Sequence, residues 1–254
     1  MNRIATAEES ILAQALFPPF SPALALTGGH SSSARRSIRQ PGESSATFTP
    51  IHYEAGYAYP LLVWLHSSSG NEHELPQVMP LVSMRNYVAV APRGSSAHPR
   101  HANRFQWQQS QNDIEVAEAR VADCIASAER RFNIHPERIF LVGCGGGGTM
   151  ALRIAWNEPS RFAGVVSFNG PLPKRWRPLH RVNELRCVPC MLVSSRDSRA
   201  YPASEVCNDL RLLHAAGCTV SLRQYPGGDD LTNNMLSDLD RWLMQLVCGG
   251  DVSR

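Results

Sequence analysis

The chain has 254 residues, of which 43% are hydrophobic and 19% charged, and its formal net charge is +3. This length suits one large α/β domain with a substantial core and is short for two. The composition is typical of a globular protein rather than a disordered one. The small net charge, without a basic stripe interleaved with aromatic residues, argues against a nucleic-acid partner.

Residues 1–45 are rich in Ser, Gly, Pro and Ala and include SSSARRS and PGESS. Such a segment buries too little apolar area to order itself, so we expect a flexible low-complexity tail, followed by one folded domain over residues 46–254. Glu8 and Glu9 precede the apolar stretch ILAQALFPPF, which therefore lacks the basic flank of a secretory signal. Seven cysteines, an odd number, do not suggest a disulfide framework. With no apolar run of about 18 residues, we expect a cytoplasmic protein without a membrane span.

Short apolar runs alternate with helical periodicity from Phe48 onward. Six of these runs predict strands, over residues 59–66, 87–92, 138–143, 164–168, 190–195 and 220–225. The clearest helix is expected over residues 113–132, where the apolar side chains form one stripe, and others after Ser204 and near the end of the chain. This alternation predicts an α/β fold with a doubly wound, mostly parallel sheet. Cys187 and Cys190 form a CxxC pair, which we interpret as small residues at the start of a buried strand.

The stretch LVGCGGGGTMALRIA places a glycine-rich turn between a predicted strand and an amphipathic helix. Gly143, Gly145 and Gly148 satisfy the dinucleotide-binding pattern G-x-G-x-x-G, but that interpretation needs an acidic residue after the next strand, where Asn169 stands instead. A second interpretation is a nucleophile elbow of the type G-x-S-x-G. The third is a tight strand-to-helix junction without a site.

The sequence around this turn resembles bacterial α/β-hydrolases of the phospholipase/carboxylesterase family. YPLLVWLHSSSGNEHEL is similar to the strand and oxyanion loop LHGxGGNExEL of that family, and YPGGDDLTNNMLSDLDRWL to the segment that carries its histidine in PGGHE. NYVAVAPRG, ERRFNIHPERIFLVG and EPSRFAGVVSFNG add to the likeness, which covers about residues 59–247. The resemblance implies an α/β-hydrolase fold and a family that hydrolyses carboxylic esters, including lysophospholipid-type and acyl-thioester substrates.

The resemblance places Gly145 at the nucleophile position and Asp229 at the histidine position. Asp197 matches the triad acid, because it follows its strand as the acid of the family does. The backbone N–H groups of Ser68 and Gly146 match the oxyanion hole, which is made of main chain. Two of three triad groups are therefore missing, and we expect a catalytically degenerate protein. We expect it to bind a small ester, acyl or carboxylate ligand and to have no cofactor. If Gly145 keeps the strained elbow, its φ should be positive.

Two alternatives concern Cys144 and the pair Asp197 and Asp229. Cys144 could replace the serine if the turn slipped by one residue, and a reactive thiol with a lowered pKa would support that alternative. If Asp197 and Asp229 faced each other, Arg196 or Arg199 could neutralise them, or Mg²⁺ or Ca²⁺ could bind between them.

His214 lies in the helical run DLRLLHAAG, where we expect a half-buried structural histidine rather than a base.

Overall fold

The computed structural model describes residues 45–174 and 182–249. Almost all of the predicted tail, residues 1–45, lies outside the described residues. Within the described residues, no helix is long and apolar enough to cross a membrane.

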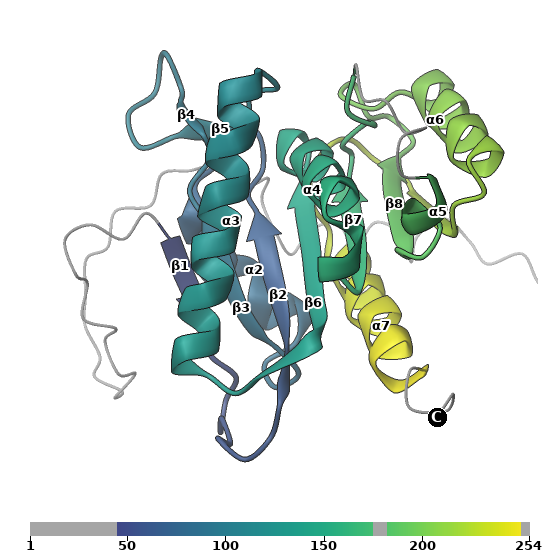
Figure 1. Ribbon diagram of the computed structural model, residues 1–254. Helices are drawn as coiled ribbons and strands as arrows, with labels where there is room; N and C mark the ends of the chain where they lie inside the picture. Colours follow the sequence, from purple (N-terminus) through teal and green to yellow (C-terminus); the bar gives the residue numbers. More distant parts are fainter. Residues whose placement is uncertain (1–44, 175–181, 250–254) are drawn as a thin grey trace, which may run out of the picture. The chain divides into compact units, whose positions relative to one another are not determined.

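A seven-stranded sheet in the order β1-β3-β2-β6-β7-β8-β9 forms the centre of the fold (Figure 1). Only β1 runs antiparallel, beside β3, and the other neighbours pair in parallel. The predicted doubly wound, mostly parallel sheet is therefore confirmed. The strands are β1 Ser45–Phe48, β2 Tyr59–Leu65, β3 Val88–Pro92, β6 Ile134–Cys144, β7 Gly164–Phe168, β8 Cys190–Ser195 and β9 Val220–Tyr225. A separate pair consists of β4 Ser96–Ala97 and β5 Phe105–Gln106.

Alternate side chains of each strand enter two different hydrophobic clusters, because successive residues of a strand face opposite sides of a sheet. Leu61 and Val63 of β2 belong to the cluster that includes residues of α3, α4, α5 and α6, whereas Leu62 and Trp64 belong to the cluster that includes residues of α2 and α7. Figure 1 shows α3 and α4 on one face of the sheet and α2 and α7 on the other. The helices are α2 Leu75–Val82, α3 Gln111–Arg131, α4 Gly146–Asn157, α5 Val182–Leu185, α6 Ala203–Ala215 and α7 Asn233–Gly249, with short 3₁₀ turns η1 Glu72–Glu74 and η2 Pro159–Arg161.

Two expectations about local structure were wrong. The helix after the glycine turn is not amphipathic, since α4 is buried along its whole length from Gly147 to Trp156. Its glycines let it approach the sheet so closely that little surface is left for solvent. Of the CxxC pair, Cys190 is buried at the start of β8 as expected, but Cys187 lies in the preceding turn and is exposed.

Candidate active site

The predicted site residues gather at the carboxyl ends of the parallel strands, at the upper end of the sheet in Figure 1. The chain adds strands first on one side of β2 and later on the other, so the order reverses there. Ligands of open α/β sheets bind in the crevice at such a switch point. Two segments meet at this place: residues 66–70 after β2, called the oxyanion loop below, and the turn at Gly145 after β6. The loops that follow β8 and β9 also contact each other.

Gly145 has φ 54° and ψ −121°, so the positive φ predicted for an elbow is confirmed. Two backbone hydrogen bonds hold the turn: the Gly145 N–H donates to the Phe168 carbonyl at 2.7 Å, and the Thr149 N–H donates to the Gly145 carbonyl at 3.1 Å. The backbone thus has the strained strand-to-helix conformation that would present a nucleophile. Glycine supplies no side chain to present.

The neighbouring glycines are required by close packing rather than by the turn itself. A Cβ on Gly143 would lie 2.3 Å from the Gly147 carbonyl oxygen, and one on Gly147 would lie 2.4 Å from the carbonyl oxygens of Leu65 and His66. Around Gly145 the packing is less tight, since the three atoms nearest to a Cβ there all belong to Ser68, and the closest is its hydroxyl oxygen at 3.1 Å. A side chain at position 145 therefore needs only a small shift of the Ser68 side chain, although the positive φ strains any residue other than glycine.

The two predicted oxyanion-hole residues, Ser68 and Gly146, lie together. The Ser68 backbone nitrogen is 3.8 Å from the Cβ position of residue 145, which is close enough for its N–H to serve a reacting group there. The Gly146 N–H, however, donates to the Ser68 hydroxyl at 3.1 Å. One of the two expected donors is thus already bonded to a side chain of the protein.

His66 fixes the start of the oxyanion loop and is fully buried. Its Nε2 accepts from the Gly94 N–H at 2.9 Å, so the ring proton lies on Nδ1, which donates to the Ser67 carbonyl at 2.9 Å. Burial lowers the pKa of His66 to about 4. With both ring nitrogens bonded to backbone, His66 supports the loop and does not replace the missing base. The indole N–H of Trp107 donates to the His66 carbonyl at 3.0 Å and holds the same segment.

Glu74 is a site residue that the sequence analysis missed. Its carboxylate accepts from the Ser67 hydroxyl at 2.7 Å, from the Ser67 N–H at 3.1 Å and from the Trp64 indole N–H at 2.9 Å. Burial raises its pKa. Ser67 stands where the resembled motif LHGxGGNExEL has glycine. This serine and the acidic residue seven positions later were the sequence signal from which the contact between Ser67 and Glu74 could have been predicted.

The loops after β8 and β9 are brought together, but not in the way predicted for Asp197 and Asp229. The Asp229 carboxylate accepts from the Ser198 hydroxyl and, at 3.2 Å, from the Arg199 backbone N–H. Asp197 is exposed, and its own N–H donates to the Gly227 carbonyl at 2.9 Å. Over the described ranges neither Arg196 nor Arg199 forms an ion pair with Asp229, so the expected guanidinium partner was wrong. A hydroxyl and a main-chain N–H from the adjoining loop take that place.

Cys144 does not have the properties of a nucleophile. Its thiol is buried, and burial raises its pKa, with further contributions from the negative charges of Glu74, Asp229 and Asp230. Thiolate is the reactive form, so this environment suppresses reactivity.

The described part of the chain likewise offers no group of three His, Cys, Asp or Glu side chains that could hold a metal ion. His214, expected to be half-buried, is exposed on α6 because it lies on the outward face of that helix.

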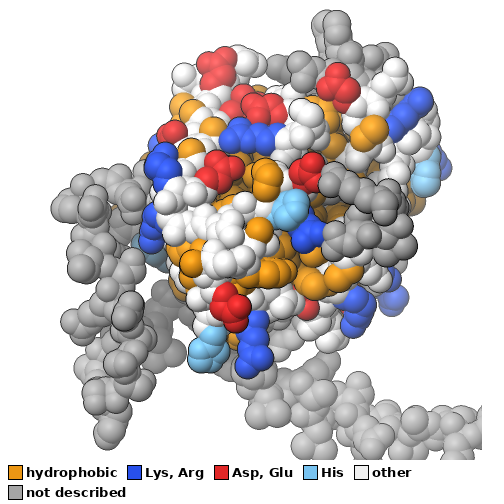
Figure 2. Space-filling model, turned by 60° about the horizontal axis from the view of Figure 1, so that its bottom comes forward, with side chains coloured by type: hydrophobic (Ala, Val, Ile, Leu, Met, Phe, Trp, Pro, Cys, Tyr) orange, Lys and Arg blue, Asp and Glu red, His pale blue; other side chains and the backbone are white. Residues whose placement is uncertain are grey.

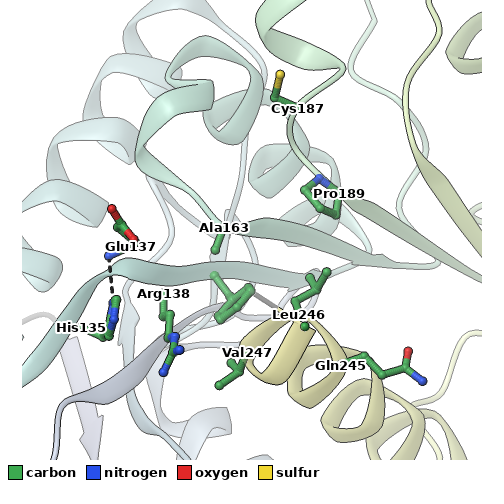
Figure 3. A pocket seen from close by; sticks show the side chains of 11 residues that line it. His135, Glu137, Arg138, Ala163, Cys187, Pro189, Gln245, Leu246 and Val247 are labelled. Carbon is green, nitrogen blue, oxygen red and sulfur yellow. Dashed lines mark hydrogen bonds between the residues drawn. The ribbon is translucent and has the colours of Figure 1, made fainter. Parts of the chain in front are cut away.

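A separate cavity of about 490 Å³ opens at the opposite edge of the sheet, and none of the predicted site residues lines it. Figure 2 looks toward this end of the molecule, where hydrophobic side chains gather between charged ones and histidine. Figure 3 shows Leu246 and Val247 of α7 opposite His135 and Arg138 at the start of β6. The remaining lining residues are Glu137, Phe140, Ala163, Cys187, Pro189, Gln245 and Gly249. The Glu137 N–H donates to His135 Nδ1 at 3.2 Å at the rim.

Comparison with known proteins agrees with this geometry. The family model described as phospholipase/carboxylesterase matches residues 90–247. A protein of Nocardia uniformis subsp. tsuyamanensis named as an esterase, NocK, is 31% identical over 121 residues, covering 45% of this chain. The match covers 33% of NocK, so the chain spans about a third of the length of that relative.

Solved structures of esterases share the fold. Esterase PE8 superposes with a TM-score of 0.66 at 18% identity, covering 80% of this chain and 98% of its own. A carboxylesterase from Mesorhizobium loti gives a TM-score of 0.64 at 19% identity, with 80% and 99% covered. The Bacillus cereus carboxylesterase gives 0.62 at 14% identity, with 80% and 93% covered.

Proposed function

Because this chain belongs to the phospholipase/carboxylesterase family of α/β-hydrolases, we propose that it is a catalytically degenerate member that keeps the scaffold of the site as a place to bind a small ester or acyl ligand. The observation that carries the proposal is the backbone of Gly145. It keeps the strained elbow at φ 54° without a side chain that could attack an ester.

Serine-hydrolase chemistry divides its work among a nucleophile, a base that removes the nucleophile's proton, and an acid that orients the base. Here the nucleophile position is glycine and the histidine position is Asp229, whose carboxylate is bonded to Ser198 and the Arg199 backbone. In well-studied hydrolases that lack the triad, about 10³- to 10⁴-fold acceleration over water remains, from the oxyanion hole and from binding. Turnover by the mechanism of the family is therefore not expected.

The charges around the elbow favour a neutral ligand. The thiol of Cys144, next to Gly145, lies within the field of three carboxylates, Glu74, Asp229 and Asp230. A ligand carboxylate placed there would be repelled by these like charges, whereas an uncharged ester would not. The names of the relatives, an esterase and carboxylesterases, agree with an ester as the ligand class.

A direct test compares the purified protein with two variants on a short-chain chromogenic ester. One variant is Cys144→Ala, and the other combines Gly145→Ser with Asp229→His. We expect the wild type and Cys144→Ala at the buffer background and measurable turnover in the double variant, since Gly145 keeps the elbow backbone and Asp197 follows β8 as the acid of the resembled family follows its strand. Wild-type turnover that disappears in Cys144→Ala would replace the proposal with a cysteine-dependent esterase.

A further inference from the structure

The side chain of Ser68 lies against the empty nucleophile position. Its hydroxyl oxygen is 3.1 Å from the point where a Cβ of residue 145 would stand and 3.2 Å from the corresponding point of Gly146. The same oxygen accepts the Gly146 N–H at 3.1 Å. We propose that the Ser68 hydroxyl occupies the oxyanion hole of this chain, so that Ser68 is a blocking residue, a second departure from catalysis beside the missing triad groups. This inference deepens the proposed function and rests on it.

The Gly146 N–H needs a partner because of its place in α4. The first N–H groups of a helix have no intrahelical acceptor and need a partner from elsewhere. Gly146 is the first residue of α4, one position before those that an N-cap side chain bonds, so its acceptor has to come from another segment. Ser68 therefore caps α4 from another segment of the chain, with the N–H that in an active hydrolase would stabilise an oxyanion.

The oxyanion loop is held so that Ser68 remains at this place. On one side, Ser67 is bonded through both its N–H and its hydroxyl to the buried Glu74. On the other, the Gly70 N–H donates to the Ser67 carbonyl at 2.9 Å and closes a tight turn in which Ser69 has φ 64°. The Ser68 hydroxyl is thus presented to the elbow by a fixed turn.

This placement limits what a restored triad can do. A serine at position 145 would put its Cβ 3.1 Å from the Ser68 hydroxyl, and the Gly146 N–H would still be bonded to that hydroxyl. A substrate oxyanion would have to displace it before gaining the hydrogen bond. Loss of one oxyanion donor lowers kcat by about 10²- to 10³-fold in a serine protease. Because a hydroxyl can rotate away in part of the population, we expect removal of Ser68 to raise the activity of the restored enzyme by about 10- to 100-fold.

The first experiment does not depend on catalysis. Hydrogen exchange of the Gly146 amide is followed by NMR in the full chain, in Ser68→Ala and in the matched control Ser69→Ala. We expect exchange to become about 3- to 10-fold faster in Ser68→Ala and to stay unchanged in Ser69→Ala, since only Ser68 bonds this amide. Equal rates in the wild type and Ser68→Ala would overturn the inference.

The second experiment measures esterase activity of Gly145→Ser with Asp229→His, with and without Ser68→Ala. Higher kcat in the triple variant supports the block. Equal kcat in two active variants overturns it. If both variants stay at background, the proposal that positions 145 and 229 are the nucleophile and histidine positions fails. The exchange rates of the Gly146 amide then still decide the role of Ser68.

Discussion

Lowering the pH from 8 to 5 should weaken the fold through His66, which is fully buried beneath the oxyanion loop. The folded protein holds the neutral ring, with Nε2 accepting from Gly94 and Nδ1 donating to Ser67. A second proton on Nε2 would break the bond from the Gly94 N–H and place a charge in the core. Burial accordingly lowers the pKa from 6.5 to about 4.

The sign and size of the effect follow from this difference. Between pH 6.5 and 4 the unfolded chain binds the proton and the folded chain does not, so protonation favours unfolding. The stabilisation is complete above about pH 6.5 and is lost as the pH falls toward 4. The full difference corresponds to about 3 kcal/mol, of which about 2 kcal/mol is lost by pH 5. Glu74 acts in the opposite direction, because its raised pKa makes proton uptake favour the folded state.

Urea unfolding at pH 8, 6.5 and 5 measures this term when the wild type is compared with His66→Gln. The variant keeps Glu74 and every other titrating group, so their contributions cancel in the comparison. His66→Gln should be less stable than the wild type at pH 8, yet lose about 2 kcal/mol less between pH 8 and 5. If both proteins lose the same free energy of unfolding over that range, the structural role assigned to the neutral His66 ring is incorrect.

Three further outcomes are expected. Gly143→Ala should lower the free energy of unfolding by about 3 kcal/mol or more, because its Cβ would lie 2.3 Å from the Gly147 carbonyl oxygen. Gly145→Ala should lower it by only about 1–3 kcal/mol, through backbone strain. Urea unfolding that reverses this order would contradict the packing argument. A chromogenic disulfide reagent should titrate the exposed Cys187, Cys207 and Cys248 at once and the buried Cys144 only on unfolding, and a rapid equivalent that Cys144→Ala removes would speak for a reactive elbow thiol. Glu74→Ala should cost about 1–3 kcal/mol in thermal unfolding, since it leaves the donors of Ser67 and Trp64 without their acceptor; the exposed Glu115→Ala is the control, and equal losses would remove the case for a structural Glu74.

The interior of the sheet could be predicted from sequence because its strands are continuous apolar runs. The bounds of β7, β8 and β9 agree with those expected. At the start of β6 the pattern gives no signal, since Ile134 to Glu137 are largely exposed and only Ile134 pairs, with Tyr59, before an irregularity in the register. β1 was missed for a similar reason: its four residues are half-exposed and become a strand through antiparallel pairing with β3.

The site was predictable where main-chain geometry sets it and not where side-chain partners do. The positive φ of Gly145 follows from the strand-to-helix turn, which the glycine spacing marks. The partner of Asp229 is Ser198, 31 residues away, and the choice between its hydroxyl and a neighbouring guanidinium depends on how two loops pack. The role of Glu74 as an acceptor was not predicted, because it depends on contact with Trp64 at the buried end of β2.

The elbow persists without a nucleophile because the surrounding packing determines it. α4 approaches β2 so closely that Gly147 contacts the carbonyl of Leu65, and the loop after β7 approaches equally closely, since a Cβ on Gly170 would lie 2.3 Å from the Gly145 carbonyl. The chain between the end of β6 and the start of α4 must therefore turn within one residue, and a positive φ at Gly145 achieves this. These close contacts are made with main-chain carbonyls, so they need neither a nucleophile side chain nor a base. The backbone of the site is therefore set without triad side chains, and this is why we expect two substitutions to be enough to restore turnover.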